Sequence, residues 1–93
     1  MAAPVYAADP PAARQAVTLD ALVAVYHRPS GATHLLATPS PELLDALADG
    51  PADAALLRDR LAVLYDLGDD DDASGAIAAR MEELVTAGLA WRV

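Results

Sequence analysis

The chain has no cysteine, no lysine and no phenylalanine, and its apolar runs are short. Without cysteine there is neither a disulfide framework nor a thiolate metal site, so a cytoplasmic location is the simplest interpretation. The longest apolar runs fall far short of a membrane span, and the N-terminal segment lacks the charged start and continuous apolar run of a signal peptide. We therefore expect one small domain without a membrane partner.

Positive charge is also scarce, because fourteen acidic residues against six arginines give a net charge of −8. Affinity for nucleic acid depends largely on neutralising phosphates, and this chain is poorly equipped for that. The sequence therefore predicts no nucleic-acid partner and favours peptides or protein surfaces. The simpler alternative is that the negative charge only maintains solubility.

Residues that usually carry catalysis are few and are placed for structure. Ser30, Ser40 and Ser74 each lie where a turn or a helix cap favours serine, and there is no cysteine nucleophile or lysine base. No glycine pattern matches a phosphate-binding loop. We expect no enzymatic activity and no cofactor.

A metal site is not predicted either. The acidic segment 66–72 does not fit an EF-hand, because the twelfth position counted from Asp66 is Ile77 rather than glutamate. The only imidazoles are His27 and His34, whereas metal sites usually need three or four convergent ligands.

The central feature is a predicted β-hairpin. Two β-rich runs, residues 22–27 and 33–37, flank the turn-forming Pro29-Ser30-Gly31. A type I turn over 28–31 suits proline at its second position and predicts a positive φ at Gly31.

That turn also predicts the register of the hairpin. Counted outward, Tyr26 lies opposite His34, and Val25 lies opposite Leu35. His27 and His34 then point to opposite faces of the sheet. One face carries Val23, Val25 and Leu35, and the other carries Ala24, Tyr26, His34 and Leu36.

The remaining elements follow from local signals. Residues 1–13 are predicted to form an extended arm or loose tail, and residues 14–19 a first strand. Three helices are predicted at 41–48, 52–65 and 73–87, with Ser40 capping the first, Gly50 stopping it, and Gly88 closing the third. The acids at 69–72 suit a helix N-terminus, where Asp72 or Ser74 would cap it. Residues 90–93 form a short tail or terminal strand.

The predicted order is β-β-β-α-α-α, an α+β fold in which a three-stranded antiparallel sheet precedes three helices in a winged-helix-like arrangement. Arg58, Asp59 and Arg60 should face solvent on the second helix, and Trp91 should anchor the small core. The core stripes of the second and third helices are Leu57, Leu61 and Leu64, and Ile77, Met81, Leu84 and Val85.

Three segments resemble a known family. They read VYHRPSGATHLL at 25–36, PELLDAL at 41–47 and MEELVTAGLA at 81–90. This combination resembles the PqqD family of recognition domains for ribosomally made natural products, and most closely the PqqD-like peptide chaperones associated with HPr kinase-related proteins. The SGATHLL piece is fairly specific, whereas the helical pieces are generic. The resemblance defines residues 14–93 as a PqqD-like peptide-binding domain.

The resemblance implies a non-catalytic bacterial domain that recognises a leader or precursor peptide and presents it to a modifying enzyme, with an HPr kinase-related protein as a candidate partner. The peptide would add to the third strand and lie against the third helix, with Ile77 and Met81 either near the groove floor or in the core beneath it. The acidic segment 66–72 would favour basic peptides. The implied peptide-binding residues are Thr33, His34, Leu35, Leu36, Ala37, Ile77, Arg80, Met81 and Leu84.

Two other classes of function remain open. A winged-helix DNA-binding or regulatory module would use 73–87 as its recognition helix, although Glu82 and Glu83 would repel phosphates there. A structural oligomer would pair its exposed strand edge, or its N-terminal arm, with a second copy to form a homodimer.

Overall fold

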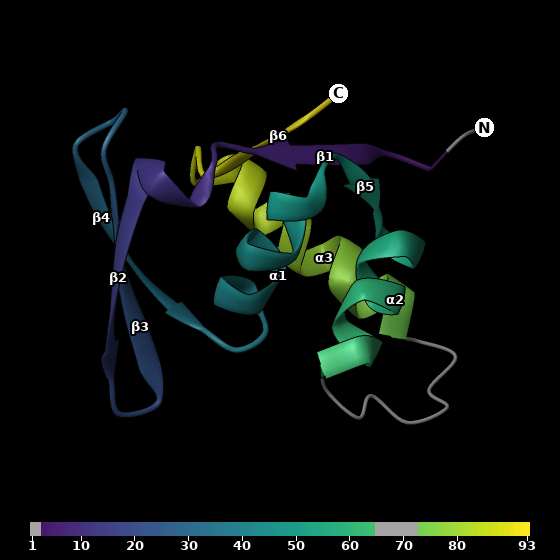
Figure 1. The fold of residues 1–93 in the computed structure, drawn as a ribbon, viewed down its shortest axis with the longest axis horizontal. Helices are drawn as coiled ribbons and strands as arrows, with labels where there is room; N and C mark the ends of the chain where they lie inside the picture. The colour runs from purple at the N-terminus through teal and green to yellow at the C-terminus, as the bar shows by residue number, and fades with distance from the viewer. Residues whose placement is uncertain (1–2, 65–72) are drawn as a thin grey trace.

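A computed structural model of the chain, which describes residues 3–64 and 73–93, shows an α+β fold with two three-stranded antiparallel sheets and three α-helices in those ranges (Figure 1). One sheet stands beside the helices, and the other crosses one end of them. The strands are β1 (Val5–Ala8), β2 (Arg14–Leu19), β3 (Leu22–His27), β4 (Ala32–Ala37), β5 (Ala52–Asp53) and β6 (Ala90–Arg92). The helices are α1 (Ser40–Ala46), α2 (Ala54–Leu64) and α3 (Ala73–Thr86), with short 3-10 turns η1 (Pro11–Ala13) and η2 (Leu47–Asp49).

The sheet beside the helices has the strand order β2-β3-β4. The predicted strand at 14–19 is confirmed, and the predicted third helix ends within one residue of α3. The predicted element order is only partly matched, because β1, β5 and β6 form a second sheet that the sequence did not indicate. None of the helices in the described ranges has the length and apolar content needed to cross a membrane.

The second sheet changes the interpretation of the N-terminal segment. β1 is its central strand, and it pairs with β5 on one side and β6 on the other. Tyr6 is only 1% exposed and belongs to the core. The expectation of a loose tail is therefore wrong for Val5–Ala8, although the segment is extended as expected. A strand of four residues whose partners lie far along the chain leaves no local pattern to detect.

The register of the hairpin differs by one residue from the prediction. Tyr26 lies opposite Thr33, and Val25 lies opposite His34. Gly31 has the expected positive φ of 70°, but its N–H donates to the His27 carbonyl at 2.8 Å, so the loop between the strands is 28–31. His27 is the last paired residue of β3 and lies opposite Ala32.

Side-chain contacts hold His27, the residue that closes the four-residue loop, in place. The His27 imidazole is hydrogen-bonded through Nε2 to Asp9 at 2.8 Å and through Nδ1 to the Ser30 hydroxyl at 2.7 Å. Both contacts hold the ring on the inner face, where His27 is buried. The polar ring nitrogens are thereby satisfied, as buried polar groups must be.

The register decides which face each side chain of β4 takes, because a one-residue slip flips the whole strand. Leu36 lies opposite Val23 and packs against the core, whereas Leu35 is 62% exposed on the other face. His27 and His34 share one face, which corrects the prediction that they point apart. Among residues 3–64 and 73–93, no group of three His, Cys, Asp or Glu is placed to hold a metal ion.

The core lies between the three helices and the second sheet. Leu43, Leu57 and Met81 have no exposed surface, and Leu89 and Ala90 are buried where the chain enters β6. Trp91 does not anchor the core, because it is 44% exposed on β6. A strand alternates its side chains, so burying Ala90 turns Trp91 outward.

The helix ends follow the sequence except at Ser40 and at the start of α2, which begins at Ala54 rather than at 52. Gly88 has φ 81°, and the Leu89 N–H donates to the Leu84 carbonyl at 3.0 Å, which is the predicted glycine stop of α3. Ser40 is the first residue of α1 rather than its cap, which is Pro39. At α2, the Asp53 carboxylate accepts from the Leu56 N–H at 2.8 Å and caps the helix. The predicted cap at Asp72, the acids at 66–72 and the core role of the Leu64 side chain lie outside the described residues.

Arg60 does not lie as predicted on the surface of α2. It was expected to face solvent with its neighbours, but its guanidinium Nη1 donates to the Ala46 carbonyl at 3.0 Å and to the Gly50 carbonyl at 2.7 Å. These carbonyls lie at the end of α1 and just after η2, where helix carbonyls lack partners. The Arg60 side chain therefore holds the connection between α1 and α2 in place.

A polar cluster joins the second sheet to α3. The Tyr6 hydroxyl donates to Glu82 Oε2 at 2.6 Å, and the Arg92 guanidinium is paired with the same carboxylate. Burial, and then the hydrogen bond to Glu82, raises the pKa of Tyr6 above its ordinary value of 10.0. Hydrogen bonds from Arg92 and then Tyr6 lower the pKa of Glu82 below its ordinary value of 4.5.

We therefore predict that stability has a plateau between about pH 4.5 and 10 and falls on both sides. Glu82 has a depressed pKa in the folded state, so its contribution is present above pH 4.5 and is lost as the pH falls through that depressed value. Tyr6 has a raised pKa, so its contribution is present below pH 10 and is lost as the pH rises through the raised value. Urea unfolding across this range measures both limits.

The matched control compares two neighbouring carboxylates. Glu82→Gln should flatten part of the acid-side fall, whereas Glu83→Gln should leave it unchanged, because Glu83 forms only an exposed ion pair with Arg80, which contributes little to stability. Identical acid profiles for the two variants would contradict the assignment.

Candidate functional site

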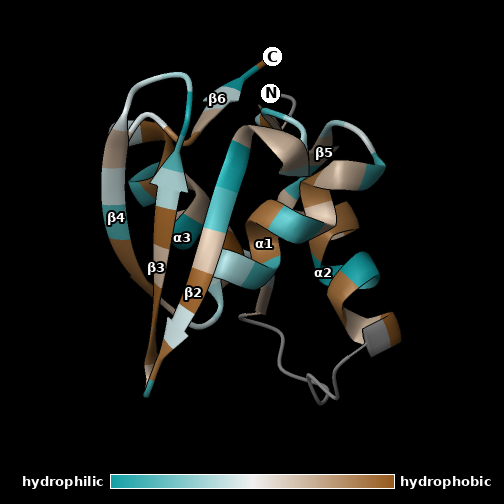
Figure 2. Ribbon diagram, turned by 60° about the vertical axis from the view of Figure 1, so that its left-hand side comes forward, coloured by the Kyte–Doolittle hydropathy of each residue, from teal (hydrophilic) through white to brown (hydrophobic). Residues whose placement is uncertain are grey.

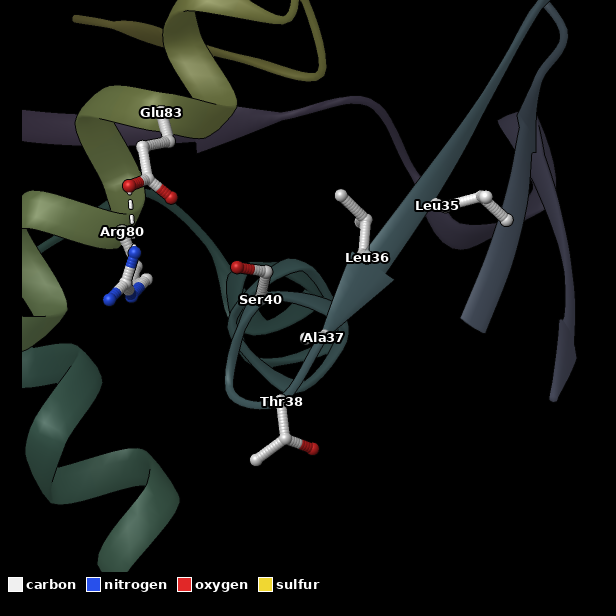
Figure 3. Close-up of a pocket in the computed structure, with 7 residues that line it drawn as sticks. All are labelled: Leu35, Leu36, Ala37, Thr38, Ser40, Arg80 and Glu83. Carbon is white, nitrogen blue, oxygen red and sulfur yellow. Dashed lines mark hydrogen bonds and ion pairs between the residues drawn. The ribbon is translucent and has the colours of Figure 1, made fainter. Parts of the chain in front are cut away.

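A groove of about 320 Å³ lies between the end of β4 and α3 (Figure 3). Leu36 projects into the space between the strand and the helix, and Leu35 points the other way, across the sheet. Arg80 and Glu83 approach from α3 on the opposite side. The lining residues are Leu35, Leu36, Ala37, Thr38, Ser40, Arg80 and Glu83.

β4 is an edge strand, with β3 as its one neighbour in the described part of the chain. The sequence predicted this edge, because the strand at 33–37 leads directly into the first helix. An edge strand presents backbone N–H and C=O groups along its free side, which can pair with another extended chain. The groove lies where such a chain would run.

The helix side of the groove supplies one charge of each sign. Arg80 and Glu83 form an ion pair of 2.7 Å, three residues apart on α3, with their side chains 48% and 62% exposed. An exposed pair of this kind contributes little to stability. Either partner can therefore exchange it for a ligand at small cost.

The structure separates the predicted site residues into three groups. Leu35, Leu36, Ala37 and Arg80 line the groove, and Thr33 and His34 lie farther along β4 outside its lining. Buried in the core are Ile77, Met81 and Leu84, with exposures of 5%, 0% and 2%. Of the two placements left open for Ile77 and Met81, the structure shows the core.

Three lining residues were not among the predicted ones: Thr38, Ser40 and Glu83. Glu83 had a usable signal, because a residue three positions from Arg80 lies on the same helix face. Thr38 and Ser40 gave no such signal. Their place depends on how the chain turns from β4 into α1, and that turn contains the cis Thr38–Pro39 bond.

The Asp9, His27 and Ser30 side chains form a chain of hydrogen bonds with the residue types of a hydrolase triad. This cluster lies at the turn of the hairpin, where the Ser30 hydroxyl accepts from the Ala32 N–H at 3.3 Å. The three residues line neither the groove beside β4 nor a second groove, beside α1, that is described below. We interpret the cluster as the support of the hairpin rather than as a nucleophile.

A second groove of about 220 Å³ lies between α1 and the inner face of β2 and β3. Arg14 and Asp45 form an ion pair of 3.1 Å across it. Glu42 also lines it and accepts from the Thr38 hydroxyl at 2.9 Å through Oε1, while its buried Oε2 has no partner among the described residues. No pattern in the sequence indicated this groove.

No family model, no curated protein and no solved structure matches this chain. The candidate site therefore rests on the geometry of β4 and α3.

Proposed function

We propose that this chain is a non-catalytic domain that binds a leader or precursor peptide as an added strand on β4 and presents it to a modifying enzyme. The observation that carries the proposal is the groove between the edge strand and α3. Peptides that add to a sheet edge gain affinity from main-chain hydrogen bonds and selectivity from the side chains around them. β4 and α3 provide these two parts.

The groove suggests which peptides fit. β4 has six residues and would pair with a peptide segment of similar length. Leu36 offers an apolar contact, and Arg80 and Glu83 offer one charged contact of each sign. We therefore expect a peptide with an apolar residue facing Leu36 and a charged residue facing α3. The net charge of −8 favours basic peptides in the encounter.

The resemblance to PqqD-like peptide chaperones supports the same function. The succession of β2, β3 and β4 before α1, α2 and α3 is compatible with the fold that the resemblance implies, and β1, β5 and β6 stand outside that pattern. In this proposal the domain acts in the cytoplasm, and its enzyme partner is a peptide-modifying protein such as an HPr kinase-related protein. Nucleic acid is not a proposed partner, because Arg80 and Arg92 on this side are paired with Glu83 and Glu82.

The test is a titration of the isotope-labelled chain with precursor-like peptides encoded beside it, followed by NMR. We expect shifts at Leu36, Ala37, Thr38 and along the Arg80 face of α3. Arg80→Ala should weaken binding by about fivefold to tenfold, equivalent to about 1 to 1.4 kcal/mol. Arg58→Ala is the matched control, because Arg58 lies on α2 and lines neither groove.

Strand addition also predicts which backbone N–H groups of the peptide are needed for binding. In an antiparallel pair, only alternate backbone N–H groups of the peptide face the neighbouring strand. N-methylation at one set of alternate positions should abolish binding, and methylation at the other set should leave it. Equal effects of the two peptides, or no shifts with any peptide, would sink the proposal.

A further inference from the structure

Among the residues that the structure describes, no helix or strand covers the face of the β2-β3-β4 sheet that points away from the helices (Figures 1 and 2). The strand pairings place five large apolar side chains there, each between 39% and 62% exposed. No position on this outer face of the three strands is Asp, Glu, Lys, Arg or His. The five residues are Val17, Leu19, Leu22, Tyr26 and Leu35.

These side chains form a continuous patch rather than scattered contacts with solvent. Val17 lies opposite Ala24, which lies opposite Leu35, and Leu19 lies opposite Leu22 in the next outward row. Single exposed apolar residues are normal, but a contiguous patch with polar surroundings marks an interaction surface. The peptide groove shares only Leu35 with the patch and does not explain the exposure of the other four residues.

We propose that a second copy of this chain covers the outer face, sheet against sheet, in a two-fold symmetric dimer. Each copy carries a net charge of −8, so two copies repel one another over most of their surfaces. The outer face is a surface on which contact buries no like charges. Apolar faces of two sheets pack together in the same way within β-sandwiches.

The turns at the two ends of the sheet select the orientation of the second copy. Asp20 lies in the β2–β3 turn at one end, and Arg28 begins the β3–β4 turn at the other. Both side chains belong to exposed residues. A two-fold axis perpendicular to the strands would bring Asp20 of one copy near Arg28 of its partner at each end. An axis parallel to the strands would instead place like charges together.

The size of the patch sets the strength of the dimer. Three strands of six residues cover a flat area of about 14 by 20 Å, from the spacing between strands and the rise per residue. Two such faces, taken as flat, bury roughly 600 Å² in total, and protruding side chains add to this area. An interface of this size is in the range of weak and transient interfaces. We therefore expect a reversible dimer that forms as the concentration rises. The dimer covers Leu35 but leaves the groove open beside Leu36 and Arg80, and this inference does not depend on the proposed function.

The experiment is sedimentation equilibrium of the full chain from micromolar to millimolar concentration. The unmodified chain should shift from monomer to dimer, and Val17→Lys should weaken dimerisation at least tenfold. Val63→Lys is the matched control, because it adds the same charge at a valine that is 84% exposed on α2 and should leave dimerisation unchanged. Val17 is 51% exposed, so the variant should fold, and circular dichroism checks this.

A second pair of variants tests the orientation. Asp20→Asn and Arg28→Gln should each weaken the dimer about twofold to fivefold, and the double variant should be no weaker than either one. Asparagine tolerates the positive φ of 52° at Asp20, so the turn should persist. A chain that stays monomeric at millimolar concentration would overturn the proposal, as would equal dimerisation of the Val17→Lys and Val63→Lys variants.

Discussion

Replacing Tyr6 by alanine is expected to lower the free energy of unfolding by about 3–5 kcal/mol, the range for removing a fully buried aromatic side chain. Tyr6 is 1% exposed, lies in the central strand of the second sheet and donates a hydrogen bond to Glu82. Its loss opens a cavity between that sheet and α3. The melting temperature should fall by roughly 15 °C or more.

The chain provides its own control for this experiment. Tyr26 is 40% exposed on the outer face of the other sheet, so Tyr26→Ala should cost about 1 kcal/mol or less. Both variants are compared by urea unfolding at low concentration. Equal losses would show that residues 5–8 are not an integral part of the folded domain.

Replacing Met81 by alanine should lower the free energy of unfolding by about 2–5 kcal/mol without changing peptide affinity in the folded fraction. Met81 has no exposed surface and lies in the core cluster, so its truncation leaves a void that the groove does not share. The neighbouring Arg80→Ala variant should behave in the opposite way. It should keep the stability and lose part of the peptide affinity.

These two adjacent positions therefore separate a core role from a binding role. Unfolding is followed by circular dichroism and affinity by calorimetry with the same peptide. A Met81→Ala protein that keeps its stability but loses affinity would return Met81 to the groove floor and contradict the burial seen here.

The sequence predicted the elements that are set by neighbouring residues. The strand at 14–19 and the end of α3 at Gly88 depend on short patterns, and the structure confirms both. The partners of β1 could not be predicted, because Val5 pairs with Asp53 and Tyr6 with Arg92. Pairing over such separations leaves no trace in a local window.

The hairpin register failed for a related reason. The turn alone allowed a three-residue or a four-residue connection, and the observed four-residue loop turns Leu36 toward a core whose other members lie far along the chain. The predicted positions of Leu35 and Leu36 in the site are wrong for the same reason, because the one-residue shift in register exchanges them between the two faces of the sheet. Of the four residues that the resemblance implies on α3, Arg80 lines the groove, whereas the packing of the helix buries Ile77, Met81 and Leu84.

The position of β1 between β5 and β6 has a consequence for how the chain matures on the ribosome. β1 is made early, yet its second partner ends at Arg92, so the second sheet stays incomplete until that segment has left the exit tunnel. At ordinary rates of synthesis this leaves β1 without β6 for roughly 4 to 17 s. During that interval both the side chain of Tyr6 and one edge of its strand are open to other chains. The first sheet and α1, which need only nearby residues, can form meanwhile, so the domain should mature from its middle outward and close by joining its two ends.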